Sequence, residues 1–144
     1  MKIYTILLNE DIDSNFNRYD LAVNYITIDN LLKQKDCSLY KKMHEKRIIG
    51  FDSEEGISQL LKYIEVFRNN EDYEAIELYR NYTIANGAHR LACAIYFEHK
   101  DVFVDVKPGL VKRYYGIDWF KEKGFTEEEL KQIEETKWEI LKKL

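Results

Sequence analysis

Proline, histidine and cysteine are scarce in this chain of 144 residues, which has one proline, three histidines and two cysteines. Cys37 and Cys93 are too far apart to form a CxxC pair, so we expect two reduced thiols. His89 and His99 are separated by ten residues on one expected helix and cannot share a metal ion. We therefore expect no disulfide and no protein-built metal site.

Excess basic charge and long apolar runs are also missing. The formal net charge is −4 and the sequence pI is about 5.5, which argues against nonspecific binding to nucleic-acid phosphates. The apolar run in "MKIYTILLNEDID" is too short for a signal peptide, and no stretch approaches the roughly 20 residues that a membrane helix needs. We expect a cytoplasmic protein without a membrane segment.

The composition is that of a folded protein, with 45% hydrophobic, 33% charged and 14% aromatic residues. A chain of this length can bury a hydrophobic core without metal or disulfide support. No repeat, low-complexity segment or linker divides it. Residues 1–144 are therefore expected to form a single domain.

Hydrophobic periodicity predicts a mixed α+β order of elements. Strands are expected at 2–8, 21–28, 74–79, 82–85 and 102–106, with a two-residue hairpin turn at 80–81. Helices are expected at 36–48, 51–70, 87–100, 117–124 and 126–144. Asp52 with Glu55, and Thr126 with Glu129, are predicted capping boxes.

The segment "TIANGAHRLACAIYF" (83–97) predicts a strand, a tight turn and a helix that begins near His89 and Arg90. Gly87 allows a sharp turn and Ala88 stays small, so a ligand could approach the free N–H groups of the first helical turn. Positive side chains oppose the helix dipole there, unless an anion binds. The alternative is a solvated first turn, or an Arg90 paired with a carboxylate.

The segment "AIELYRNYTIANGAHRLACAIYFEHKDVFVDV" (75–106) resembles the core of the ParB/sulfiredoxin superfamily. In that superfamily a hairpin leads to a "DGxHR" or "GxRR" turn, a helix and a further strand. "LAVNYITIDNLL" (21–32) resembles the strand that opens the domain. The resemblance implies a small mixed sheet with surrounding helices over about 21–106 and a C-terminal helical extension over 107–144.

By this resemblance, the turn binds phosphate, and the implied ligand is ATP or another nucleoside phosphate with Mg²⁺. The implied nucleotide-binding or phosphate-binding residues are Asn86, Gly87, Ala88, His89 and Arg90. Sulfiredoxins carry a cysteine in this turn, where this chain has Ala88, which argues against sulfinic-acid repair. Partition proteins add a basic DNA-binding domain, whereas 107–144 is expected to end in an acid-rich helix.

Small-molecule kinases of the superfamily have aspartate where this chain has Asn86, and a glutamate soon after the opening strand. Asp36 lies near that second position, so it and His89 are the catalytic candidates; the alternative role of Asp36 is to cap a helix. Arg47 is a further phosphate-binding candidate. Its neighbours Lys41, Lys42 and Lys46 are expected to form a solvated face.

These residues predict a nucleotide-binding protein that transfers phosphate to a small hydroxyl-bearing metabolite or sugar precursor. The resemblance also implies a setting in polysaccharide biosynthesis. One alternative is a non-catalytic nucleotide-responsive module whose segment around Tyr114, Tyr115 and Trp119 meets a protein partner. Another is a ParB-like nuclease or nucleic-acid-binding protein. Whether the chain forms a homo-oligomer stays open.

Overall fold

The architecture was analysed in a computed structural model, which describes residues 1–8, 18–47, 50, 52–110 and 115–144. The helices are α1 (Ile3–Leu7), α3 (Tyr19–Leu32), α4 (Ser38–Arg47), α5 (Ser53–Arg68), α6 (Ala88–Tyr96), α7 (Ile117–Glu122) and α8 (Glu127–Lys142). The strands are β1 (Ile76–Tyr79), β2 (Ile84–Asn86) and β3 (Val104–Lys107). The fold class is therefore α+β, as the sequence predicts.

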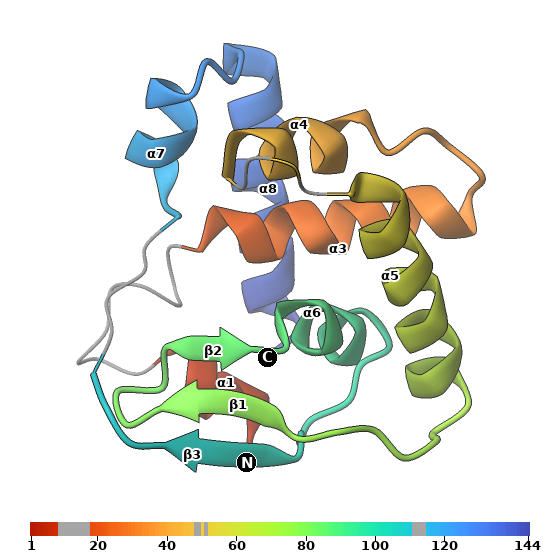
Figure 1. Cartoon of the computed structure of the whole chain (residues 1–144), viewed down its shortest axis with the longest axis vertical. Helices are drawn as coiled ribbons and strands as arrows, with labels where there is room; N and C mark the ends of the chain where they lie inside the picture. Colours follow the sequence, from red (N-terminus) through yellow and green to blue (C-terminus); the bar gives the residue numbers. More distant parts are fainter. Residues whose placement is uncertain (9–17, 48–49, 51, 111–114) are drawn as a thin grey trace.

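A small mixed sheet in the order β2-β1-β3 lies at one end of the molecule (Figure 1). β1 pairs with β2 in antiparallel and with β3 in parallel orientation, so α6 forms the crossover between the hairpin and β3. The hairpin turn is one residue longer than expected, because Tyr79 N–H donates to the Thr83 carbonyl and Tyr82 adopts a φ of 63°. A turn closed by a left-handed residue is a common three-residue hairpin connection.

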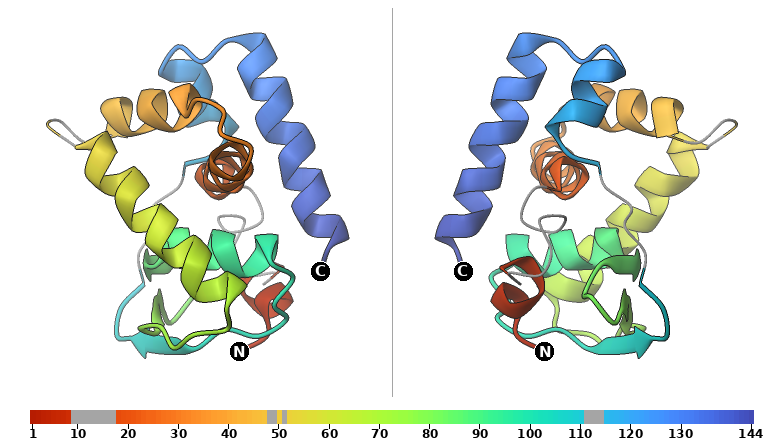
Figure 2. Two further views of the ribbon diagram at one scale, coloured as in Figure 1. Left: turned by 90° about the vertical axis from the view of Figure 1, so that its right-hand side faces the viewer. Right: turned by 90° about the vertical axis from the view of Figure 1, so that its left-hand side faces the viewer.

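Helix α3 lies at the centre, with α6 between it and the sheet and with α4, α5 and α8 around it (Figures 1 and 2). Every residue from Tyr19 to Ile28 is buried. The prediction of a strand at 21–28 is therefore wrong, and so is the opening strand that the resemblance implies over 21–32. A continuous apolar run of this length suits a buried strand and a buried helix equally, and the packing on all sides selects the helix.

The strand predicted at 2–8 is also wrong, because residues Ile3–Leu7 form the short helix α1. Ile3, Ile6 and Leu7 are buried at helical spacing, so this turn contributes three apolar side chains to the core. Within residues 1–8, the one strand-like interaction is an isolated antiparallel bridge between Lys2 and Asp101.

The starts of α5 and α8 have the capping residues that the sequence predicts. Asp52 accepts hydrogen bonds from the N–H groups of Glu54 and Glu55 and so caps α5. Thr126 and Glu129 form the predicted capping box at the start of α8. In the described part of the chain, no helix is long and apolar enough to cross a membrane.

If α3 is buried on all sides, Leu21→Ala and Ile28→Ala should each lower the free energy of unfolding by about 2–4 kcal/mol, measured by urea denaturation. These positions would lie on opposite faces of a strand, but both are at most 3% exposed in the helix. Leu61→Ala on the exposed side of α5 is the control and should cost much less. A large loss at only one of the two α3 positions would contradict the buried helix.

Candidate functional site

The turn that leads into α6 requires glycine at position 87. Its φ of +114° lies in the left-handed region, and a Cβ at this position would come within 3.1 Å of Ile76 Cγ2 and of Arg90 Nη2. Glycine is therefore required both by the backbone conformation and by close packing. Gly87 offers no side-chain cap, which leaves the first-turn N–H groups of α6 open to another acceptor.

Arg90 supports this turn from inside. Its Nη1 donates to the carbonyl oxygens of Glu74 at 2.6 Å and Ala75 at 3.0 Å, just before β1 begins. The guanidinium also lies over the ring of Tyr63, with 5.7 Å between its carbon and the ring centre. Arg90 is only 4% exposed, so part of its hydrogen-bonding capacity holds β1 against α6.

His89 is a neutral side chain in this site. Its Nε2 lies 3.1 Å from the hydroxyl of Tyr40, and burial, Arg47 and Arg90 together lower its pKa to about 4. His44 packs beside it with ring centres 6.2 Å apart, and burial followed by Arg47 lowers the pKa of His44 to about 3. At neutral pH, therefore, the arginines and not the histidines carry the positive charge.

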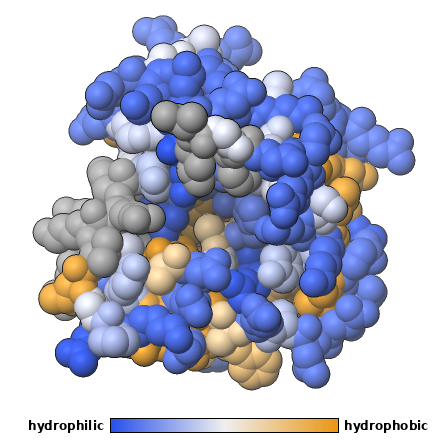
Figure 3. Space-filling view, in the orientation of Figure 1, coloured by the Kyte–Doolittle hydropathy of each residue, from blue (hydrophilic) through white to orange (hydrophobic). Residues whose placement is uncertain are grey.

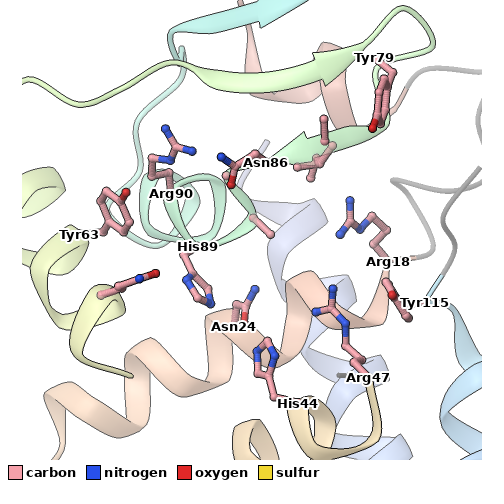
Figure 4. Close-up of a pocket in the computed structure, with 15 residues that line it drawn as sticks. Arg18, Asn24, His44, Arg47, Tyr63, Tyr79, Asn86, His89, Arg90 and Tyr115 are labelled. Atoms are coloured by element: carbon pink, nitrogen blue, oxygen red, sulfur yellow. The ribbon is translucent and has the colours of Figure 1, made fainter. Parts of the chain in front are cut away.

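A pocket of about 270 Å³ opens in front of this turn. Figure 4 shows side chains from α3, α4, α5, the hairpin and α6 around it. Its polar walls include Arg18, Asn24, His44, Arg47, Gln59, Asn86, His89 and Arg90, and its aromatic walls Tyr63, Tyr79 and Tyr115. No aspartate or glutamate is among the described residues that line it, so its lining carries the charges of three arginines, of which Arg18 is balanced by Asp20 behind the wall.

Arg18 reaches the pocket from the residue before α3. Its Nε donates to Asp20 Oδ1 at 2.9 Å, and a second contact joins Nη2 to Oδ2. Burial opposes ionisation of Asp20, but the pairing with Arg18 holds its pKa below the usual value. The pair is 6% and 0% exposed, so the carboxylate fixes Arg18 in place at the pocket wall.

Arg47 enters the pocket from the end of α4. Its guanidinium lies over the Tyr115 ring, with 4.2 Å from its carbon to the ring centre. Arg18 and Arg47 extend toward the same side of the pocket (Figure 4). Two groups at this wall have no hydrogen-bond partner among the described residues, namely Arg47 Nε and the Oδ1 of Asn24.

The structure brings together six of the seven residues that the sequence predicts for the site. Asn86, Gly87, Ala88, His89, Arg90 and Arg47 all line the pocket. The remaining one, Asp36, lies outside it, exposed, and its Oδ1 accepts a hydrogen bond from Ser38 N–H at 3.2 Å. Its position corresponds to the alternative role as a helix cap.

The lysines around Arg47 make their contacts elsewhere, as expected for a solvated face. Lys41 pairs with Glu54 at 3.4 Å, and Lys42 pairs with Glu129 at 2.7 Å. Lys46 is exposed. None of the three lines the pocket, so Arg47 is the only basic residue from α4, besides His44, that does.

The cysteines and His99 lie outside the pocket and make contacts within the fold. Cys93 is fully buried in α6, where burial raises the pKa of its thiol to about 12. His99 Nε2 lies 3.0 Å from the Phe67 carbonyl oxygen. Among the described residues, no group of three or more His, Cys, Asp or Glu side chains could hold a metal ion.

The sequence analysis missed Arg18, Asn24, His44, Gln59 and the lining tyrosines. Asn24 belongs to the segment 21–28 that is predicted as a strand, and Arg18 precedes that segment, so the sequence does not show that the two residues lie on one helix end. Asn24 did carry a signal, since it is a lone polar residue within the apolar run "LAVNYITI". Of the segment considered for a protein partner, Tyr114 lies outside the described residues, Tyr115 lines the pocket, and Trp119 packs against Phe120.

Comparison of the chain with protein-family models, with curated proteins and with solved structures finds no match. The function must therefore be inferred from the residues and geometry of the pocket.

The neutral histidines predict a loss of stability in acid. In the unfolded chain both histidines take up protons near pH 6.5, whereas the folded protein resists protonation until about pH 4 at His89 and about pH 3 at His44. The free energy of unfolding should thus fall by on the order of 3 kcal/mol for each histidine as the pH drops from 7 to 4, beyond the loss due to carboxylates. Urea denaturation across this range measures it.

The control for this prediction is His89→Gln, which keeps a polar side chain but cannot titrate near neutral pH. Its stability should vary less steeply between pH 7 and pH 4 than that of the original chain. Equal slopes for the two proteins would contradict a neutral, half-buried His89.

Proposed function

We propose that this chain binds a nucleoside phosphate, or a phosphate ester of a similar small polar metabolite, in the pocket in front of α6. The observation that carries the proposal is the charge of the pocket: three arginines and the open start of a helix surround it, and no described carboxylate lines it. An anion at this point would accept hydrogen bonds from backbone N–H groups and from guanidinium groups at once.

The arrangement of arginines suits a ligand with more than one phosphate group. Arg18 and Arg47 lie at the α3 and α4 side, while Ala88 and His89 lie at the start of α6. A diphosphate or triphosphate would contact both sides.

The ParB/sulfiredoxin-like fold is part of the same proposal. Its support is the order β1, β2, α6, β3 with the Asn86 to Arg90 turn before α6. The buried helix α3, which stands where an opening strand is implied, is a departure from that family's pattern. The charges of the pocket therefore support the ligand class independently of the family.

Binding without phosphoryl transfer is the form of the proposal that the pocket favours. A general base for a substrate hydroxyl is usually a carboxylate within hydrogen-bond reach, and Asp36 lies outside the pocket. A bound Mg²⁺ would be held mainly by the phosphates of the ligand. Transfer to a hydroxyl-bearing metabolite, a setting in polysaccharide biosynthesis and a cytoplasmic location stay predictions from the sequence.

Calorimetric titration with Mg²⁺ and, in turn, ATP, ADP, CTP and GTP tests the proposal. We expect saturable binding of at least one nucleotide, which Arg47→Gln weakens about tenfold or more because a charge-assisted hydrogen bond is lost. Arg47 is a sharper choice than Arg90, because Arg90 also holds the carbonyl oxygens of Glu74 and Ala75.

Lys46→Gln is the matched control, since it removes the same charge from the neighbouring exposed position of α4. It should leave the affinity unchanged apart from a small ionic-strength effect. Absence of binding by all four nucleotides, or equal loss in both variants, would contradict a nucleotide site in this pocket. Tight salt-dependent binding of DNA would instead favour a nucleic-acid-binding protein.

A further inference from the structure

Strand β3 forms one edge of the sheet. The backbone N–H and C=O groups on its outer side have no hydrogen-bond partner among the described residues. Ile76 N–H donates to the Phe103 carbonyl, and Val104 and Val106 are the register partners of Ile76 and Leu78. Groups that point to opposite neighbours alternate along a strand, so the N–H and C=O of Val104 and Val106 face away from β1. No described strand pairs with that side.

The same edge exposes three apolar side chains beside the charged Asp105 and Lys107. Phe103, Val106 and Leu110 are 65%, 46% and 74% exposed, respectively, and they flank or belong to β3. Figure 3 shows hydrophobic side chains interspersed with hydrophilic ones along the lower margin of the molecule, where Figure 1 places β3. An open edge strand presents unpaired N–H and C=O groups and is therefore a template for pairing with another strand.

The side chains of β3 match a second copy of the same strand. If two β3 strands pair in antiparallel orientation about Val106, each Val106 faces Val106 of the other copy, and each Asp105 faces Lys107 of the other copy. Within one chain Lys107 Nζ already lies 2.9 Å from Asp105 Oδ2 and 3.8 Å from Glu77 Oε1, so the opposed pairs would extend an alternating row of charges. Opposite charges on directly facing residues stabilise a strand pair.

We propose that two copies of this chain associate through β3, paired in antiparallel about a two-fold axis at Val106, to form a continuous six-stranded sheet. The number six follows from the three strands that each copy contributes. Self-pairing satisfies the outward backbone groups of Val106 in both copies and covers its exposed side chain. The pairing is independent of the pocket, because none of the β3 residues lines it.

Cysteine cross-linking tests the register of this pairing. In Val106→Cys the two introduced thiols face each other across a hydrogen-bonded pair, whose Cα separation of about 5.5 Å suits a disulfide. Mild oxidation should therefore give a covalent dimer on denaturing gels. Cys37 and Cys93 are buried and should contribute little background.

Leu110→Cys is the matched control, because it is more exposed than Val106 but lies four residues from the axis, which places its two copies roughly 26 Å apart. It should cross-link far less. Equal cross-linking of the two variants, or none in either, would overturn the proposal.

Charge exchange gives a second test that does not depend on new cysteines. Asp105→Lys places like charges opposite each other and should weaken the dimer roughly tenfold in sedimentation equilibrium. The double variant Asp105→Lys with Lys107→Asp restores the opposed pairs and should recover the affinity. A wild-type chain that stays monomeric up to millimolar concentration, or a double variant no better than the single one, would overturn the pairing.

Discussion

The burial of α3 on all sides is the constraint on which the remaining structure depends. The stretch of α3 from Tyr19 to Ile28 has no solvent face and must be covered completely, and α4, α5, α6 and α8 provide that cover. Three buried polar side chains lie together at the start of this stretch, namely Arg18, Asp20 and Asn24. The pocket forms beside them, with Arg18 and Asn24 in its wall and α6 opposite. The packing of the core and the position of the site are thus consequences of one helix.

Charge in the pocket is arranged so that arginine carries it and histidine does not. Arg18 is held by Asp20, and Arg47 lies over Tyr115, so both guanidinium groups are fixed before any ligand arrives. Their field and the burial of the imidazoles keep His89 and His44 neutral. A neutral imidazole at the start of α6 avoids the conflict with the helix dipole that a charged one would cause. The charge of Arg90 is instead offset by the carbonyl oxygens of Glu74 and Ala75, to which its guanidinium donates hydrogen bonds.

Elements with strong local signals could be predicted from the sequence. Helices α5 and α8 have amphipathic spacing and capping residues, and the hairpin, α6 and β3 follow from alternation, Gly87 and Pro108. Residues 2–8 and 21–28 could not be predicted, because β-branched apolar runs satisfy a helix or a strand equally until tertiary packing decides. Asn86 to Arg90 were found because they are contiguous. Arg18, Asn24 and His44 come from other elements, and only the fold brings them to the same pocket.

Amide NMR observes directly whether phosphate binds at the start of α6, as proposed. Titration of isotopically labelled protein with the nucleotide, and separately with inorganic phosphate, should shift the backbone N–H signals of Ala88, His89 and Arg90, because these groups would donate to the phosphate oxygens. The shifts should saturate together with those of the Arg18 and Arg47 side chains. Saturating shifts confined to another surface, with the Ala88 to Arg90 amides unmoved, would show that phosphate does not bind at this turn.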